Sequence, residues 1–313
     1  MEDVSGKIKR TIRKATPRAF KTIWWIFKIT ASVSFVMFLL KWAGILKWIS
    51  VAVSPAFLMF GLPGEAALAY VSGFFINVYS CVAVISTLEL SVREITILGT
   101  MSLAAHAMIL ESAVQKKTGT SFSYCFLLRT ASSLAMGIIL NLILPGRPMY
   151  VRNLTPLSDI PFIDIQPDFL PMFTDWALGL AKLTGWMICL IWFLNVVQRL
   201  LYEFGVIERI SRFFKPLLTF FGLPHNTSFL WIIANVVGLS YGSAVILDVL
   251  ERETITQRDI DLLNTHIGIS HSNFEDLMLL AACGGTWYII LLTRWIMAAV
   301  LVWGRRLLGY SDY

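Results

Sequence analysis

The sequence predicts an all-α, polytopic helical membrane protein made of two inverted repeats. Of its 313 residues, 57% are apolar and only 15% are charged, and that charged share is about ten percentage points below the one typical of a soluble domain. Apolar runs of about 20 residues, long enough to cross a bilayer as helices, recur along the chain. The third observation is an internal repeat that includes ionisable residues.

The apolar runs follow one another in two groups of five, separated by a proline- and aspartate-rich segment at 145–171. They lie at about 23–40, 43–62, 64–88, 95–114, 121–144, 177–197, 205–221, 226–250, 262–282 and 286–303. We expect helices throughout, because a bilayer admits only helices or closed barrels and no run alternates with the period of two of a barrel strand.

A constant shift in numbering, 161, relates the two halves. Between 40–63 and 201–224, nine of 24 positions are identical, including the run from Phe60 to Pro63. After an insertion of four residues the shift becomes 165, and it then pairs His106 with His271, Glu111 with Asp276, Gly119 with Gly284 and Arg129 with Arg294. Duplicated ionisable residues within apolar segments are typical of repeat-built carriers, whose site lies at the repeat interface.

The distribution of charge predicts orientation and not nucleic-acid binding. Seven basic and two acidic residues in the first 21 account for most of the net charge of +6. We therefore expect a basic cytoplasmic arm at 1–21. Membrane repeat 1 at 22–144, an extracytoplasmic loop at 145–171, membrane repeat 2 at 172–308 and a C-terminal tail at 309–313 follow it.

Two kinds of element are predicted not to cross. The run 205–221 carries four charged residues and suits an interfacial helix, as does its counterpart at 45–59. Charges flank the run 95–114 at both ends, which favours a re-entrant hairpin opening on the cytoplasmic side. Each repeat then crosses three times, and an odd number of crossings inverts the second copy. An all-spanning arrangement of five plus five also inverts, but it buries Arg209 and Arg212.

The duplicated histidines and carboxylates are the first candidate site. An ionisable group at hydrocarbon depth costs at least about 2.5 kcal/mol and therefore needs a cavity, a partner or a cargo. Together His106, Glu111, His271, Glu275 and Asp276 can relay protons or ligate a divalent ion. The simpler alternative is that each histidine pairs with the carboxylate of its own repeat and holds the hairpin tip. The sequence leaves open whether a metal binds.

Two arginines and two asparagines complete the candidate substrate-binding set. Arg129 and Arg294 lie at equivalent places in the last span of each repeat and can face a carboxylate or a polar cargo. An ion pair with Glu111 or Asp276 is the alternative. Asn77 and Asn235 lie among small residues that suit either helix packing or a broken helix that contacts a ligand.

Several motifs resemble a known group. The stretch from Phe60 to Ala66, Gly73-Phe74, Asn77-Val78 and the later Glu89 and Arg93 look like the gate, or nucleoside-recognition, domain of membrane proteins. This group is related to the membrane half of bacterial ferrous iron permeases, to spore maturation membrane proteins and to concentrative nucleoside transporters. The resemblance covers about 45–145 and, more weakly, 205–305. It implies a location in a bacterial inner membrane.

Two departures from the iron permeases limit what the resemblance implies. The chain has no GTPase domain. In addition, Phe75-Ile76 and Tyr79 replace the glycine, cysteine and proline that those permeases carry around Asn77-Val78, which removes the expected thiol.

The first functional hypothesis is a secondary transporter of a small polar solute, nucleoside-like by resemblance and coupled to ions or protons. The alternatives are a divalent metal ion permease and a non-transporting membrane scaffold or partner subunit. No P-loop, dinucleotide fingerprint or nucleophile triad is present, so we expect neither enzymatic activity nor a cofactor. The expected partners are the solute or ion and the lipid bilayer, and homo-oligomerisation is left open.

Overall fold

The computed structural model describes residues 4–146, 161–166, 168–239, 245–247 and 255–308, and every regular element among them is helical. The predicted tail at 309–313 and most of the loop at 145–171 lie outside the described residues. The first half contains α1 (Val4–Trp42), α2 (Ile45–Leu58), α3 (Ala66–Phe75), α4 (Val78–Ile85), α5 (Val92–Ala105), α6 (Met108–Lys117) and α7 (Phe122–Ile143). The second half contains α8 (Phe169–Glu203), α9 (Val206–Phe213), α10 (Lys215–Phe220), the 3-10 helix η2 (His225–Thr227), α11 (Ser228–Val236), α13 (Gln257–Ser270), α14 (Asp276–Ala282) and α15 (Trp287–Leu307).

The helix boundaries repeat at the shifts found in the sequence. Both ends of α5 correspond to those of α13 at the shift of 165, and the first residue of α7 corresponds to that of α15. Gly44 and Gly205, with φ of 74° and 62°, precede α2 and α9 at the shift of 161. Such positive φ angles favour glycine because it has no Cβ. The duplication therefore extends to backbone conformation.

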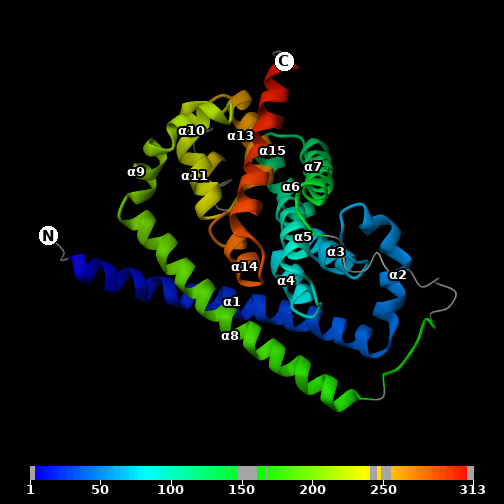
Figure 1. Cartoon of the computed structure of the whole chain (residues 1–313). Coiled ribbons are helices and arrows are strands. Elements are labelled where there is room, and N and C mark those ends of the chain that lie inside the picture. The colour runs from blue at the N-terminus through cyan, green and yellow to red at the C-terminus, as the bar shows by residue number, and fades with distance from the viewer. Residues whose placement is uncertain (1–3, 147–160, 167, 240–244, 248–254, 309–313) are drawn as a thin grey trace.

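Four described helical stretches are long and apolar enough to cross a membrane: Val92–Lys117, Phe122–Ile143, Phe169–Leu201 and Trp287–Leu307. A fifth candidate is the pair Thr30–Trp42 and Ile45–Leu58, which bends by 89° at Gly44 and is by geometry a broken span or a re-entrant loop. Helices α1 and α8 lie side by side and run in opposite directions (Figure 1). The basic arm is continuous with the first apolar run, because α1 includes both.

The structure contradicts the hairpin predicted at 95–114. Helices α5 and α6 instead form one candidate span of 26 residues that is interrupted at His106 and Ala107. The chain folds back earlier, where α3 and α4 pack side by side and a Cβ on Gly73 would lie 3.0 Å from the Cβ of Cys81. The prediction took Arg93 as a charge at the membrane surface. In the structure Arg93 caps the C-terminal end of α7, because its Nη2 donates to the Asn141 carbonyl at 3.0 Å.

This contact also corrects the predicted sidedness. Arg93 Nη2 donates to Asn141 Oδ1 at 2.6 Å, and a Cβ on Gly146 would lie 3.4 Å from Arg93 Cδ. The start of α5 and the end of α7 therefore lie together. The turn at 89–94 and the beginning of the segment 145–171 belong to the same side of the molecule, and not to opposite sides as the hairpin required.

Candidate functional site

The site begins with two equivalent helix breaks. His106 ends α5 and His271 ends α13, each with an extended backbone. The next residues, Ala107 and Ser272, have φ of 43° and 55° and are the only non-glycine residues with positive φ in the described chain. A left-handed conformation costs an L-residue roughly 1–2 kcal/mol, so surrounding contacts must hold both breaks.

Backbone and arginine contacts from other helices hold them. At each break the amide that follows the histidine donates to a carbonyl of a neighbouring helix, Ala107 N to Gly73 O of α3 at 2.9 Å and Ser272 N to Ala234 O of α11 at 3.2 Å. Each arginine donates to the two carbonyls freed by a break. The contacts are Arg129 Nε to Ala104 O at 3.0 Å, Arg129 Nη2 to His106 O at 3.0 Å, Arg294 Nε to Ile269 O at 2.7 Å and Arg294 Nη2 to His271 O at 2.6 Å. At the shift of 165 the two hydrogen bonds of Arg129 correspond to the two of Arg294, with the same donor atoms and equivalent acceptor residues.

The side chains at the two breaks meet in one His–carboxylate cluster: His106, Glu111, His271 and Asp276. His106 Nε2 lies 3.2 Å from Glu111 Oε1 and 3.3 Å from Asp276 Oδ2. His271 Nε2 lies 3.1 Å from the same Glu111 oxygen, and the two imidazole rings are 5.0 Å apart. The residues of both repeats therefore meet in one cluster, which is the first of the two arrangements left open by the sequence. The alternative, pairing within a repeat, describes the contact of His106 with Glu111 but not that of His271 with Glu111.

The two arginines differ in their side-chain partners. Arg129 Nη2 forms a 2.6 Å ion pair with Glu111 Oε2. Within the described chain no ion pair joins Arg294 to Asp276, and Arg294 Nη1 instead donates to Asn273 Oδ1 at 3.0 Å. The pairing expected within the second repeat is therefore wrong, while that in the first is confirmed.

Asn273 links Arg294 to a predicted site residue. Its Nδ2 donates to Asn235 Oδ1 at 2.5 Å, and Asn235 Nδ2 donates to the Trp231 carbonyl at 2.8 Å. Sequence reasoning missed Asn273 because its counterpart at the shift of 165 is the apolar Met108, so duplication gives no signal for it.

Glu275 and Asn77 lie outside the His–carboxylate cluster by their contacts. Glu275 accepts a hydrogen bond from the hydroxyl of Tyr79 on α4, whereas His271 Nε2 faces Glu111. Asn77 caps α4, its Oδ1 accepting from Ser80 N at 3.0 Å. Tyr79 is a further residue that the sequence did not mark as a partner, since it joins α4 to the second repeat only through the fold.

The hydrogen bonds assign the histidine protons. Nδ1 of His106 lies 3.1 Å from the Leu103 carbonyl, and Nδ1 of His271 lies 2.7 Å from the Ile267 carbonyl. A carbonyl only accepts, so each Nδ1 carries a hydrogen. Each Nε2 faces carboxylate oxygens, and a close contact between two lone pairs is repulsive. Each of the two Nε2 atoms therefore shares a proton or a cation with the carboxylate oxygens that face it, and for His106 one proton serves both Glu111 and Asp276.

The His–carboxylate cluster is closed to solvent. His271, Arg129 and Arg294 are fully buried, and Glu111, the most exposed of these groups, is 9% exposed. Buried charges persist only when they are paired and hydrogen-bonded, which the contacts above provide. Any ion or solute that reaches this centre therefore requires the helices around it to separate.

Three donors have the arrangement of a cation site. One ligand atom each from His106, Glu111 and His271 lies within 4.8 Å of the others. The contacts of 3.1–3.2 Å between Nε2 and Oε1 suit atoms that share an ion at about 2.0–2.2 Å. Both imidazoles also direct their other N–H to a backbone carbonyl, as metal-bound histidines generally do.

Fold and site together define a multi-span helical membrane protein in which two halves of the chain supply one buried polar centre. The chain is 28% identical over 300 residues to "Uncharacterized membrane protein YvoD" of Bacillus subtilis (strain 168), a match that covers 94% of this chain and 93% of that protein. It is thus distantly related to a bacterial membrane protein. No protein-family model and no solved structure matches the chain.

Proposed function

We propose that the protein is a secondary transporter in which the His–carboxylate cluster carries the coupling ion, a proton. One observation supports this most strongly. His106 Nε2 lies almost equally far from a carboxylate of each repeat, 3.2 Å from Glu111 and 3.3 Å from Asp276. A proton on this nitrogen can pass to either carboxylate without a change of backbone.

The coupling follows from the relation of the two repeats. In the proposed arrangement α13–α14 crosses the membrane as its counterpart α5–α6 does. Each repeat then crosses three times, by α1, α5–α6 and α7 and by α8, α13–α14 and α15, and an odd number of crossings inverts the second copy. The interrupted helices meet where such carriers bind substrate and ion. Rocking one repeat against the other would separate His106 from Asp276 and expose the proton first to one side and then to the other.

The cargo follows from chemistry and from the resemblance. A small polar solute, nucleoside-like by resemblance to the gate domain group, would meet the arginines and asparagines beside the cluster once the helices open. Arg294, Asn273 and Asn235 form a chain of donors and acceptors that suits hydroxyl and carbonyl groups. Transport would take place across a bacterial inner membrane with the N-terminus in the cytoplasm.

Uptake into proteoliposomes tests this proposal. Vesicles holding the purified chain are supplied with nucleosides, organic anions or divalent metal ions, with and without a pH gradient. We expect flux of one class that the gradient drives, and a loss of about tenfold or more in Glu111→Gln, since a charge-assisted hydrogen bond is lost. Glu89→Gln, which alters an exposed carboxylate, is the matched control. Gradient-independent flux would remove the proton from the proposal.

A divalent metal ion is the second candidate cargo, favoured by the three converging donors of His106, Glu111 and His271. Isothermal titration with Mn²⁺, Co²⁺ and Zn²⁺ tests it. We expect stoichiometric binding that His271→Ala abolishes and that the exposed His225→Ala leaves unchanged. No binding of any of the three ions would count against a metal permease.

A scaffold or partner subunit is the remaining alternative. The mutual satisfaction of His106, Glu111, His271 and Asp276 is what such a role requires. It would be favoured if no class of solute moved and if Glu111→Gln lowered stability alone.

A further inference from the structure

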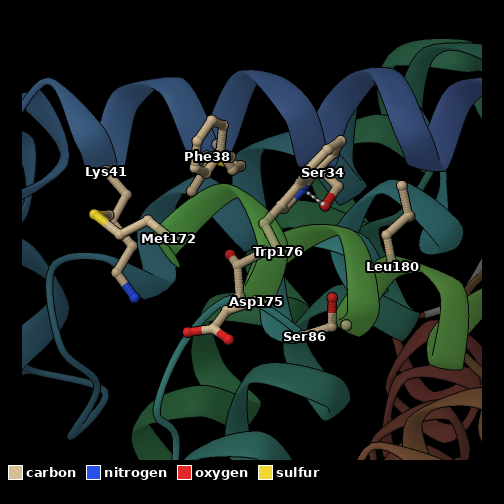
Figure 2. A pocket seen from close by; sticks show the side chains of 11 residues that line it. Ser34, Phe38, Lys41, Ser86, Met172, Asp175, Trp176 and Leu180 are labelled. Carbon is tan, nitrogen blue, oxygen red and sulfur yellow. Dashed lines mark hydrogen bonds between the residues drawn. The ribbon is translucent and has the colours of Figure 1, made fainter. Parts of the chain in front are cut away.

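A pocket lies apart from the His–carboxylate cluster, where α8 packs against the C-terminal part of α1 and the end of α4. Its volume is about 270 Å³, near the lower end of the range of roughly 300–1,000 Å³ for small-molecule sites. Phe38 of α1 and Trp176 of α8 form much of its apolar wall. Trp176 Nε1 donates to Ser34 Oγ at 2.9 Å (Figure 2), so the indole is held in place. We call this the α1–α8 pocket.

Two opposite charges border the α1–α8 pocket. Lys41 comes from the end of α1 and Asp175 from the second turn of α8. In the view of Figure 2 the ends of the Lys41 and Asp175 side chains both lie below the α1 ribbon. Both residues are exposed, and neither forms an ion pair with another residue of the described chain, although the Lys41 ammonium lies near enough to Glu65 for the two charges to attract each other. A ligand can therefore engage Asp175 directly, and its anionic oxygen competes with Glu65 for Lys41.

Two hydroxyl groups add acceptors beside these charges. Ser86 Oγ donates to the Ala83 carbonyl at 2.8 Å, and Thr87 Oγ1 donates to the Val84 carbonyl at 2.8 Å. Each hydroxyl hydrogen is thus used within α4, and the oxygen keeps a lone pair for a donor in the pocket. A primary ammonium has three N–H donors, and Asp175, Ser86 and Thr87 supply three acceptors.

We propose that the α1–α8 pocket binds a zwitterion that carries a primary ammonium and an anionic oxygen. The ammonium contacts Asp175 and the two hydroxyls, the anionic oxygen contacts Lys41, and the apolar remainder lies on Phe38 and Trp176. This is the headgroup chemistry of an ethanolamine phospholipid, and a small free zwitterion shares it. Aromatic residues near the ends of apolar helices, such as Trp176, are typical of the membrane interface, which is where headgroups lie.

Native mass spectrometry of the full chain, delipidated in detergent, tests the proposal with four probes. These are dioleoyl phosphatidylethanolamine, phosphatidylcholine, phosphatidylglycerol and free phosphoethanolamine. We expect phosphatidylethanolamine to be retained at least about tenfold better than phosphatidylcholine, because a quaternary ammonium has no N–H to donate to Asp175. Phosphatidylglycerol has no ammonium and should bind as weakly as phosphatidylcholine.

Matched variants locate the binding. Asp175→Asn and Lys41→Met should each weaken retention about tenfold, while Asp168→Asn and Lys28→Met, which lie outside the pocket, should not. Gly179→Leu fills the pocket without altering a charge, and a Cβ on Gly179 meets nothing within 4 Å, so the fold tolerates it. Gly185→Leu, equally unobstructed on α8, is its control.

The outcomes separate the sources of the zwitterion. Retention of phosphatidylethanolamine that depends on Asp175, Lys41 and Gly179 supports a lipid site. Equal affinity for phosphoethanolamine, with the same dependence, supports a free zwitterion. Phosphatidylglycerol retained as well as phosphatidylethanolamine, or retention unchanged in Asp175→Asn and Gly179→Leu, overturns the proposal. Retention of no probe also overturns it.

Discussion

Arg129 and Arg294 make equivalent hydrogen bonds to the backbone but differ in their charged partners. Each donates to two carbonyls that a helix break frees, and a buried carbonyl without a donor is costly. Of the two arginines, only Arg129 forms an ion pair with a carboxylate of the described chain, that of Glu111 at 2.6 Å. Duplication has therefore preserved the residue type and the backbone contacts, while the ion pair is found in the first repeat alone.

A pair of double-mutant cycles tests this difference. Glu111→Ala should cost about 3–5 kcal/mol, because it leaves the Arg129 charge buried without its carboxylate. Its coupling to Arg129→Ala should be about 0.5–3 kcal/mol, measured by unfolding in detergent. The double variant still falls below the wild type in stability, since two carbonyls lose their donor. The comparison cycle, Asp276→Ala with Arg294→Ala, should show weaker coupling, because no ion pair joins these two side chains in the described chain. Equal coupling in both cycles would contradict the asymmetry.

At the scale of elements, a glycine turn connects α2 to the folded-back pair α3 and α4, and a second glycine turn follows α10. Gly61 has φ of 63°, and its counterpart Gly222 has φ of 72°. The first turn is fixed from outside, because Arg93 Nη1 donates to the Gly61 carbonyl at 3.3 Å and Asn141 Nδ2 donates to the Met59 carbonyl at 3.0 Å. The turn thus joins α2 to the end of α7.

Substitution of Gly61 tests how strictly this turn is required. A Cβ on Gly61 would collide with the side-chain amide of Asn141, lying 2.7 Å from its Cγ, and a left-handed alanine adds roughly 1–2 kcal/mol of backbone cost. Gly61→Ala should therefore lower the unfolding temperature. Gly185→Ala, in the interior of α8 with nothing within 4 Å of its Cβ, should raise stability by about 0.5–1 kcal/mol. The measurement is a thermal melt of both variants in one detergent. An unchanged unfolding temperature in Gly61→Ala would show that the turn does not require glycine.

At the scale of the whole molecule, the two halves interlock. Helix α5 packs on α15, and α13 packs on α7. Side-chain contacts join the end of α6 to α13: Gln115 Nε2 donates to the Asn264 carbonyl at 2.8 Å, and Thr120 Oγ1 donates to Asp261 Oδ1 at 2.5 Å. Neither half is complete without the other, because each supplies partners to the buried polar groups of the other.

Sidedness follows from α5–α6 as an interrupted span. With the N-terminus in the cytoplasm, Ser91→Cys and Ile163→Cys should both react with a membrane-impermeant maleimide from outside, and Lys117→Cys should react only after permeabilisation. All three positions are exposed. The experiment needs a background without the four native cysteines. Labelling of Lys117→Cys alone from outside would show that the protein has the opposite orientation. Labelling of Ile163→Cys without Ser91→Cys would support a hairpin at 95–114.

The sequence by itself determined the class of fold and the duplication. The composition and the length of an apolar run indicate whether a segment lies in lipid or in water, so a helical membrane protein could be predicted. The shift of 165 marked the residues that the structure places at both helix breaks, since the histidine, carboxylate and arginine of His106, Glu111 and Arg129 recur in the second half; the breaks themselves were not predicted. These features are properties of single segments or of their comparison, and they need no knowledge of distant contacts.

Only the tertiary structure decided which segment folds back and which charges pair. Charges around 95–114 suggested a hairpin, but Arg93 finds its partner on Asn141, 48 residues away, and leaves α5–α6 as an interrupted span. Likewise, the spacing of His271 to its own carboxylates did not reveal that it contacts Glu111, 160 residues away. A buried polar group takes whichever partner the packing brings within about 3 Å, and sequence periodicity carries no information about that partner.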